Sequence, residues 1–458
     1  MDIVWNAKRL KEALNIDLPS DFVGGKVDFN SKDIAEGDIF IALPGEKRDG
    51  HEFVQDALSK GAALAICSQK IDSPKVAIVS DTTEALLKLA KYSRANSNAK
   101  YIGVTGSVGK TSTKEAIASI LSNFESTYFN KGSFNNHIGV PLTLASCPID
   151  AKFSVNEMGM NHAGEIRELT KLVKPHIAVI TQLGEAHIEF LGSRENICKA
   201  KCEIFEGLVD GGVAIINKDS EFFDLQMKIL AERNIREVYS FSESQESDCF
   251  IVDYQKAEDH AIVSYNILGK IYKTKNHLIG KHQAVNIGGA LLVALALGLD
   301  MDKATNSVQN IKQFYGRGEE SKVIINGKTL SIINDGYNAN PTSLGAALEN
   351  LATIKGKKIA ILSNMVELGE DSAILHASMK DKVLKAGVSE LYTVGDLIKN
   401  LHNELKDKIN CHHYDSISDE TFDDIYNKIK NEDATILVKG SNSTLIRTIV
   451  DFIKGKVG

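Results

Sequence analysis

The segment 106–112 reads Gly-Ser-Val-Gly-Lys-Thr-Ser and has the composition of a loop that binds nucleotide phosphates. Glycines let backbone N–H groups turn toward phosphate, and the N-terminus of a following helix adds partial positive charge. Lys110 would reach the outer phosphates, and the Thr111 hydroxyl would bind Mg²⁺. Val104 stands where the full motif has its first glycine, so an ordinary tight turn is the alternative. The predicted phosphate-binding residues are Gly106, Ser107, Val108, Gly109, Lys110, Thr111 and Ser112.

A carboxylate and a histidine follow two other apolar runs. Glu157 ends the run 153–157, and His187 comes shortly after the run 177–183. Taken singly, a solvated carboxylate and a structural histidine are the more common interpretations. Ligands of a parallel sheet bind at the carboxyl ends of its strands, so the two residues together favour a metal and nucleotide site beside the phosphate loop.

Lys201 lies on the apolar face of a helix that we predict over residues 194–208. It follows Ile197 by four residues and shares a stripe with Ile204 and Leu208. Two interpretations stay open. The long side chain can lead its ammonium group out to water, or the amine is buried and has altered chemistry.

The elements that would hold these residues fall into three regions of an α/β protein. Residues 1–98 predict a small α/β module. Residues 99–313 alternate apolar runs with amphipathic helices, which indicates a central, doubly wound, mostly parallel sheet that carries the phosphate loop. Residues 314–458 resume that alternation after a turn at 316–319 and predict a Rossmann-like α/β domain. The predicted strands are 38–43, 62–66, 101–105, 153–157, 177–183, 213–217, 330–334, 359–363, 391–394 and 435–438, with a hairpin at 251–265 and an alanine-rich helix from about 282.

Composition excludes several classes of protein. The 458 residues are 43% hydrophobic and 25% charged, as in globular proteins, and no run approaches the ~18 apolar residues of a membrane span. A net charge of -7 gives no basic field for nucleic acid or anionic membranes. Six scattered cysteines without CxxC spacing disfavour a disulfide framework and structural zinc. We expect a cytoplasmic protein without nucleic-acid partners or stable membrane insertion.

Further motifs extend over the chain: EGDIFIAL and DGH near the N-terminus, TGSVGKTSTKE, SFNNHIGVPLTL, NEMGMNHAGEI, AHIEFLGS and KAKCEIF in the centre, and GRGE, NDGYNANPTS and MVELG towards the C-terminus. In this order they resemble the ATP-dependent Mur ligase family over essentially the whole chain, and within it the branch that adds D-alanyl-D-alanine. The resemblance implies three domains that bind the acceptor, ATP and the incoming amine.

The resemblance implies metal ions and a modified lysine. Thr111 and Glu157 would hold one Mg²⁺, and His187 and Lys201 would hold a second, with Lys201 carbamylated by CO₂. By the same resemblance, the catalytic residues would be Lys110, Lys201, His187 and Arg317.

The resemblance also assigns binding residues. Asn286, in a segment similar to the family's GxHNxxN, would contact adenine, although Gln283 replaces the first asparagine. Asp335 and Asn338 would face the nucleotide, and Arg317 its phosphates. From the residues alone, an ordinary helix cap or loop explains these positions as well. The implied substrate contacts are Ser31, Lys32, Asn135, Asn136, Asn340 and Met365.

The reaction implied by the resemblance joins D-alanyl-D-alanine to UDP-N-acetylmuramoyl-tripeptide through an acyl phosphate, in peptidoglycan precursor synthesis. ATP and two Mg²⁺ are the expected cofactors, and we expect a monomer. Two alternatives stay open: a related ligase with another acceptor or donor, and a P-loop NTPase that does conformational work. The positions that depart from the family pattern, besides Gln283, are Asn30, Lys32, Asn334, Asn364 and Asn442.

Overall fold

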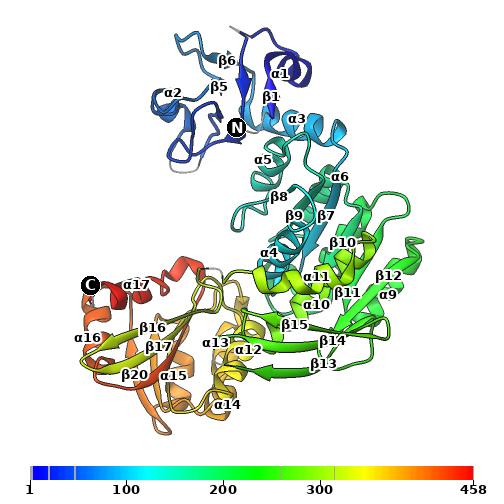
Figure 1. The fold of residues 1–458 in the computed structure, drawn as a ribbon. Coiled ribbons are helices and arrows are strands. Elements are labelled where there is room, and N and C mark those ends of the chain that lie inside the picture. The colour runs from blue at the N-terminus through cyan, green and yellow to red at the C-terminus, as the bar shows by residue number, and fades with distance from the viewer. Residues whose placement is uncertain (1–3, 19–20, 46–47, 258, 314, 457–458) are drawn as a thin grey trace.

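The computed structural model of this chain describes residues 4–18, 21–45, 48–257, 259–313 and 315–456. Its strands form four sheets, and the three larger ones are the cores of an N-terminal, a central and a C-terminal domain (Figure 1). The predicted α/β class and three-domain arrangement are thereby confirmed. Within these residues, no helix has the length and apolar character needed to cross a membrane.

The N-terminal domain is built on a parallel sheet in the order β3-β4-β5-β6, beside a small antiparallel pair, β1 and β2. Side chains alternate between the faces of a strand, so Ile39 and Ile41 pack with the residues of α1 and α3, whereas Phe40 packs with those of α2. The elements are β1 Trp5–Asn6, α1 Ala7–Leu14, β2 Val23–Gly24, β3 Val27–Asp28, β4 Ile39–Ile41, the 3₁₀ helix η1 Gly50–Phe53, α2 Val54–Ser59, β5 Leu64–Cys67, β6 Val76–Ile78 and α3 Thr82–Ala95.

The central domain has a sheet in the order β15-β14-β13-β12-β11-β10-β7-β9-β8. The strands from β8 to β13 are parallel, and β14 and β15 extend the sheet antiparallel. The elements are β7 Lys100–Thr105, α4 Lys110–Leu121, β8 Thr127–Phe129, α5 Gly139–Ala145, β9 Phe153–Glu157, α6 Glu165–Val173, β10 Ile177–Ile180, α7 Ile188–Leu191, α8 Arg194–Cys202, η2 Glu203–Gly207, β11 Val213–Asn217, α9 Phe223–Glu232, β12 Glu237–Ser242, β13 Cys249–Lys256, β14 Ala261–Ile267, β15 Lys270–Asn276, α10 Lys281–Ala296, α11 Met301–Ser307 and η3 Val308–Asn310.

The C-terminal domain has a sheet in the order β16-β17-β21-β18-β19-β20, parallel except for the edge strand β16. Helices cover both faces, as the two core clusters of this domain indicate. The elements are β16 Glu319–Ile325, β17 Lys328–Asp335, α12 Pro341–Ala352, β18 Lys357–Ser363, η4 Gly369–Asp371, α13 Ser372–Ala377, α14 Lys380–Lys385, β19 Glu390–Val394, α15 Lys399–Leu405, β20 Asn410–Tyr414, α16 Asp419–Ile429, β21 Ala434–Lys439, η5 Asn442–Thr444 and α17 Thr448–Gly455.

Three predicted elements end earlier than expected, and the first of them, the strand predicted over 38–43, ends at Ile41. The strand predicted over 177–183 ends at Ile180, where the chain turns into the cavity described below. The helix predicted over 194–208 ends at Cys202 and continues as the 3₁₀ helix η2. There the buried carboxylate of Glu203 accepts hydrogen bonds from the backbone N–H groups of Gly164 and Arg167, at the start of α6. The tighter turn therefore caps a second helix, which the periodicity of apolar residues does not reveal.

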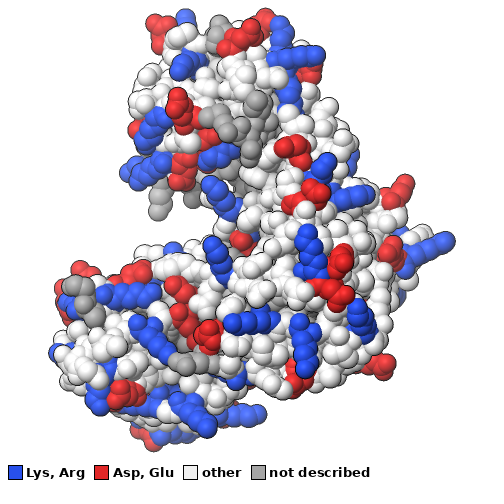
Figure 2. Space-filling model, viewed as in Figure 1, with Lys and Arg blue, Asp and Glu red and all other residues white. Residues whose placement is uncertain are grey.

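The face of the molecule drawn in Figure 2 carries Lys and Arg side chains interspersed with Asp and Glu, without a broad patch of one sign. The same view shows a hollow between the N-terminal domain at the top and the C-terminal domain at the lower left. A ligand held by all three domains would have to cross this hollow.

Candidate active site

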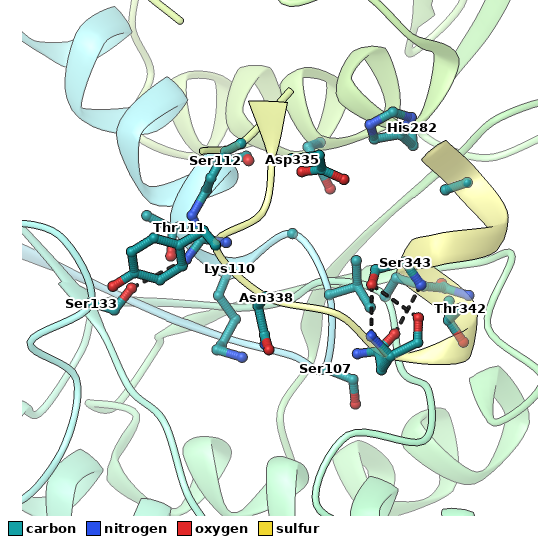
Figure 3. Close-up of a pocket in the computed structure, with 18 of the residues that line it drawn as sticks. Ser107, Lys110, Thr111, Ser112, Ser133, His282, Asp335, Asn338, Thr342 and Ser343 are labelled. Carbon is teal, nitrogen blue, oxygen red and sulfur yellow. Dashed lines mark hydrogen bonds between the residues drawn. The ribbon is translucent and has the colours of Figure 1, made fainter. Parts of the chain in front are cut away.

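A cavity of ≈ 790 Å³ lies between the central and C-terminal domains. The carboxyl ends of β7 and β9 and the start of α10 form one side, and the loops after β17, β18 and β21 form the other. Figure 3 shows Lys110, Thr111 and Ser112 on the left, Thr342 and Ser343 on the right, and Asn338 between them beside Lys110. The predicted site residues that line the cavity are Ser107, Val108, Gly109, Lys110, Thr111, Ser112, Asn135, Glu157, His187, Asn286, Arg317, Asp335, Asn338 and Asn340.

The phosphate loop has the conformation that its glycines predict. Gly109 has a φ of +88°, and α4 begins directly after it at Lys110. A Cβ atom at Gly109 would lie 2.7 Å from Oδ1 of Asn286, so the loop and the start of α10 pack without room for a side chain. The Thr181 hydroxyl donates a 2.7 Å hydrogen bond to the Val108 carbonyl and holds the loop from the neighbouring strand. Backbone N–H groups at the start of α4 are thus available to a phosphate.

The ammonium group of Lys110 lies within the phosphate loop and bonds to the loop's own backbone. Its Nζ donates a 2.8 Å hydrogen bond to the Gly106 carbonyl. Burial lowers the pKa of Lys110, and the nearby charge of Arg317 lowers it further. An anion bound between Lys110 and Arg317 would stabilise both positive charges and would raise the pKa of Lys110 again.

Glu157, at the end of β9, is almost completely buried. Asn135 donates a 2.7 Å hydrogen bond to its Oε1. Its Oε2 is buried and finds no hydrogen-bond partner among the residues that the structure describes. A buried anionic oxygen in this state is costly unless it binds a cation, so Glu157 fits the role of a metal ligand.

The loop that carries Asn135 is held by a second lysine of α4. Lys114 is fully buried, and its Nζ donates to the carbonyls of Asn130 and Gly132 at 2.6 and 2.9 Å. It also lies 2.8 Å from Oε1 of Glu115. The helix that presents Lys110 to the phosphate loop therefore also fixes the loop that contacts Glu157.

Lys201 lies on α8 with its whole side chain buried. Within the described part of the chain, its Nζ has no hydrogen-bond partner. The interpretation in which the ammonium group reaches water is therefore wrong, because the amine ends inside the protein. Burial lowers the pKa of Lys201 well below its usual range, and the charge of Lys110 lowers it further. Loss of the proton makes the amine a nucleophile, which fits a lysine that reacts with CO₂.

His187 contacts the C-terminal domain. Its Nδ1 lies 2.7 Å from Oε2 of Glu367, which follows β18. The hydrogen bond from His187 lowers the pKa of Glu367, although burial opposes this shift. A second bond crosses the boundary beside it, since the Thr342 hydroxyl donates to Oε2 of Glu185 at 2.6 Å.

Arg317 also bridges the domains. Its Nη2 donates a 3.2 Å hydrogen bond to Oγ of Ser133, in the loop of the central domain that Lys114 fixes. Its guanidinium carbon lies 4.4 Å from the centre of the Tyr337 ring, and that of Arg447 lies 5.4 Å from the same ring. The ring holds the guanidinium at the edge of the cavity, facing the phosphate loop.

Asp335 ends β17 and forms an ion pair with Lys439, at 2.5 Å from Nζ. Lys439 is almost fully buried and also donates to the Asn338 carbonyl at 3.0 Å. The carboxylate is therefore held at the cavity by the neighbouring strand β21, where it could accept a hydrogen bond from a hydroxyl of a ligand.

The other predicted residues, Lys201 among them, are not part of the lining of this cavity. The Gly106 carbonyl accepts the hydrogen bond from Lys110, and Oδ1 of Asn136 accepts a 2.9 Å hydrogen bond from the backbone N of Gly139, at the start of α5. Met365 packs in the core of the C-terminal domain and does not line the cavity. Ser31 and Lys32 lie in the N-terminal domain, next to Phe29, whose ring contacts that of Phe134 at 6.0 Å. The latter contact brings the segment 29–32 beside the loop that holds Asn135.

The departures from the family pattern differ in their surroundings. Gln283 and Asn442 line the cavity. Asn364 is held by the backbone N of Ile398, at 3.0 Å from its Oδ1, and Asn334 is buried outside the lining. Substitutions at 364 and 334 therefore leave the cavity wall unchanged, whereas that at 442 alters it.

Ser133, Lys114 and Glu367 are site residues that the sequence did not reveal as such. Ser133 and Glu367 stand within motifs that were recognised as a whole, without roles for these positions. Lys114 could have been found from the sequence, because it is a charged residue on the buried, mostly apolar face of α4. This is the same kind of signal that drew attention to Lys201.

The described residues contain no cluster of three or more His, Cys, Asp and Glu side chains that could hold a metal ion by themselves. Thr111, Glu157 and His187 nevertheless present oxygen and nitrogen ligands to one cavity. Such partial sets are typical of Mg²⁺ sites, where the phosphates of a nucleotide complete the coordination.

Comparison with known proteins gives three family matches that together span most of the chain. They are the "Mur ligase family, catalytic domain" over residues 26–100, the "Mur ligase middle domain" over 104–294, and the "Mur ligase, glutamate ligase domain" over 316–442. The UDP-N-acetylmuramoyl-tripeptide--D-alanyl-D-alanine ligase of Rickettsia prowazekii is 38% identical, over 98% of this chain and all of the relative.

Two solved structures have the same fold. MurF from Acinetobacter baumannii has a TM-score of 0.84 and 28% identity, covering 98% of this chain and 99% of its own. The MurF ligase of Thermotoga maritima, in complex with ADP, has a TM-score of 0.78 and 26% identity, covering 94% of this chain and 98% of its own.

Proposed function

This chain belongs to the Mur ligase family, and we propose that it joins D-alanyl-D-alanine to UDP-N-acetylmuramoyl-tripeptide in an ATP-dependent reaction. The observation that carries the proposal is the meeting, in one cavity, of a phosphate loop, a buried carboxylate and an arginine from a second domain. The proposed role is a step of peptidoglycan precursor synthesis, on which cell wall growth, cell shape and cell division depend.

The chemistry requires that a carboxylate be activated, because its oxygen is a poor leaving group. An oxygen of the acceptor carboxylate attacks the γ-phosphorus of ATP, and the bond to ADP breaks to give an acyl phosphate. The amine of the dipeptide then attacks the acyl carbon, loses a proton and expels phosphate. Lys110 and Arg317 both line the cavity and would stabilise the charge that spreads over the transferred group.

Two Mg²⁺ ions are proposed as cofactors. Thr111 and Glu157 would hold one, and His187 and Lys201 the other. The neutral amine of Lys201 would add CO₂ and release one proton, which gives a carbamate. That anion would relieve the repulsion between Lys201 and Lys110. The ions would supply positive charge to the phosphate oxygens.

The three domains divide the substrates among them. We propose that residues 1–98 bind the UDP end of the acceptor, with Ser31 and Lys32, that residues 99–313 bind ATP, and that residues 314–458 bind the dipeptide and close on ATP. Asn286, Asp335 and Asn338 would contact the nucleotide. The contact between Phe29 and Phe134 supports this division, because it brings the segment 29–32 of the N-terminal domain beside the loop that carries Asn135.

A cytoplasmic monomer is the proposed state. All six cysteines, each in a described position, are free thiols, as in a reducing compartment. ATP and a nucleotide-linked precursor are also substrates of that compartment.

The test is mass spectrometry of the products formed from UDP-N-acetylmuramoyl-tripeptide, D-alanyl-D-alanine, ATP and Mg²⁺. The proposal expects one UDP-linked pentapeptide for each ADP released. A P-loop NTPase that does conformational work would release ADP at the same rate without the dipeptide. A related ligase with another donor would form product only with a different amine, which a panel of dipeptides and amino acids would reveal.

A further inference from the structure

Glu367 of the C-terminal domain reaches into the ligand set of the central domain. Its Oε2 lies 2.7 Å from Nδ1 of His187. The backbone N of Glu189 lies 3.5 Å from the backbone carbonyl oxygen of Glu367, and α7 packs against η4 at this point. The contact is therefore part of a joint between the two domains.

Both residues of the pair have left-handed backbone conformations. His187 has a φ of +67°, and Glu367 has a φ of +64°. For a residue with a side chain, this conformation costs about 1–2 kcal/mol, so local sequence preference does not produce it. Gly369, which contacts Glu189, also has a positive φ of +63°. The two strained residues face one another, which indicates that the contact between them holds each in place.

The geometry decides which ring nitrogen of His187 faces the cavity. Nδ1 lies 2.7 Å from the carboxylate, so a proton on Nδ1 would face Glu367 and the lone pair would be left on Nε2. His187 lines the cavity together with Lys110 and Glu157. A histidine with a carboxylate behind it and a free second nitrogen is the common arrangement of a metal-binding imidazole.

We infer that Glu367 is a positioning residue for the second metal ion, which acts by fixing the ring of His187. The inference rests on the proposed function, in which His187 binds that ion. Because Glu367 comes from the C-terminal domain, the ring is fixed only when the domains are docked. By linkage, the ion then strengthens docking by the same factor by which docking strengthens binding of the ion.

The test measures metal binding directly. Mn²⁺ is titrated into the full-length protein saturated with a nonhydrolysable ATP analogue, and free Mn²⁺ is followed by electron paramagnetic resonance. In Glu367→Ala and in the isosteric Glu367→Gln, the affinity of the second ion should fall about tenfold, while that of the first ion stays unchanged. Glu370→Gln removes an exposed carboxylate from the same loop and should bind both ions normally.

A second readout follows the domains. Small-angle scattering should record a smaller radius of gyration when Mn²⁺ is added to the unmodified protein with the analogue, and a reduced change in Glu367→Ala. Unchanged Mn²⁺ affinity in both Glu367 variants, beside weakened binding in His187→Ala, would overturn the inference and leave the proposed function standing. Unchanged binding in His187→Ala as well would overturn the inference together with the metal role of His187, whereas product formation is judged separately by mass spectrometry.

Discussion

Asn135 donates a 2.7 Å hydrogen bond to Oε1 of Glu157, and Oε2 of the same carboxylate is left without a partner among the residues described. One oxygen of Glu157 is thus fixed by the protein and the other is offered to the cavity. The orientation is set before a ligand binds, so the ligand need not order this side chain. The loop that carries Asn135 is in turn fixed by Lys114.

Replacing Lys114 by Met should disturb catalysis through this loop. Removal of the ammonium leaves the buried Asn130 carbonyl without its donor, which costs about 1–3 kcal/mol, and lets the loop shift. A displacement of about 1 Å at the reacting groups can cost about 10²-fold in rate. We expect a fall in kcat and a raised KM for Mg²⁺ in steady-state assays. Lys131→Met, at an exposed lysine of the same loop, is the control, and equal kinetics in both variants would contradict the prediction.

Replacing Lys201 by Ala should lower the ligation rate by about 10²–10³-fold, as the loss of one charge stabiliser does in other enzymes. A short carboxylate such as acetate should partly restore the rate, because it returns the missing anion. The carbamate itself should give a carbon NMR signal after exposure to ¹³C-labelled bicarbonate. Lys199→Ala removes an exposed lysine of the same helix and should keep both the rate and the signal. Full activity of Lys201→Ala would refute the carbamate.

Replacing Arg317 by Ala or Lys should lower kcat by about 10²–10³-fold and change the KM for ATP much less. Lysine should not restore the rate, because its single ammonium cannot reproduce a planar fork held against the Tyr337 ring. Arg447→Ala, at the other guanidinium beside that ring, tests whether stacking alone matters and should leave kcat near its original value. A normal kcat in Arg317→Lys would show that the planar guanidinium group is not required.

Stability should fall as the pH is lowered from 7 to 4, in part because of His176. Burial lowers its pKa to about 4, and its Nδ1 accepts a 3.0 Å hydrogen bond from the backbone N of Tyr101. Between pH 6.5 and 4, the unfolded chain binds this proton and the folded chain does not, so the free energy of unfolding decreases as the pH falls through that window.

The measurement is denaturant unfolding at several pH values. His176→Gln should lose less stability than the unmodified protein between pH 6.5 and 4, because it has no proton to gain. His137→Gln, at an exposed histidine of the same domain, should follow the unmodified protein. Parallel pH profiles for His176→Gln and the unmodified protein would exclude His176 as a source of the effect.

The fold was predictable where the sequence pattern is strong. The buried parallel strand β11 is an apolar run, β9 alternates apolar and polar residues, and the observed bounds of both are the predicted ones. Strand β20 was not predicted. Its residues are only half-buried or exposed, and His412 and His413 interrupt any apolar run, so its place comes from pairing with β19.

The types of residue at the site could be predicted from the sequence, whereas the contacts between the two domains could not. Lys110 and Glu157 follow strands, so the edge of the sheet alone brings them together. The contact of Arg317 with Ser133 and that of His187 with Glu367 join segments far apart in the chain. No local spacing encodes such contacts, because they depend on how two domains meet.

The division of the cavity between two domains has a consequence for how enzymes of this kind diversify. Most groups for phosphate chemistry stand on the central sheet, and Arg317 is added to them from the C-terminal domain, whereas Asn442 and the loop after β21 stand on the C-terminal sheet with its own core. A mutation at the second sheet can alter which amine is accepted while phosphate transfer is inherited intact. Selection can therefore explore new donors without first losing the reaction.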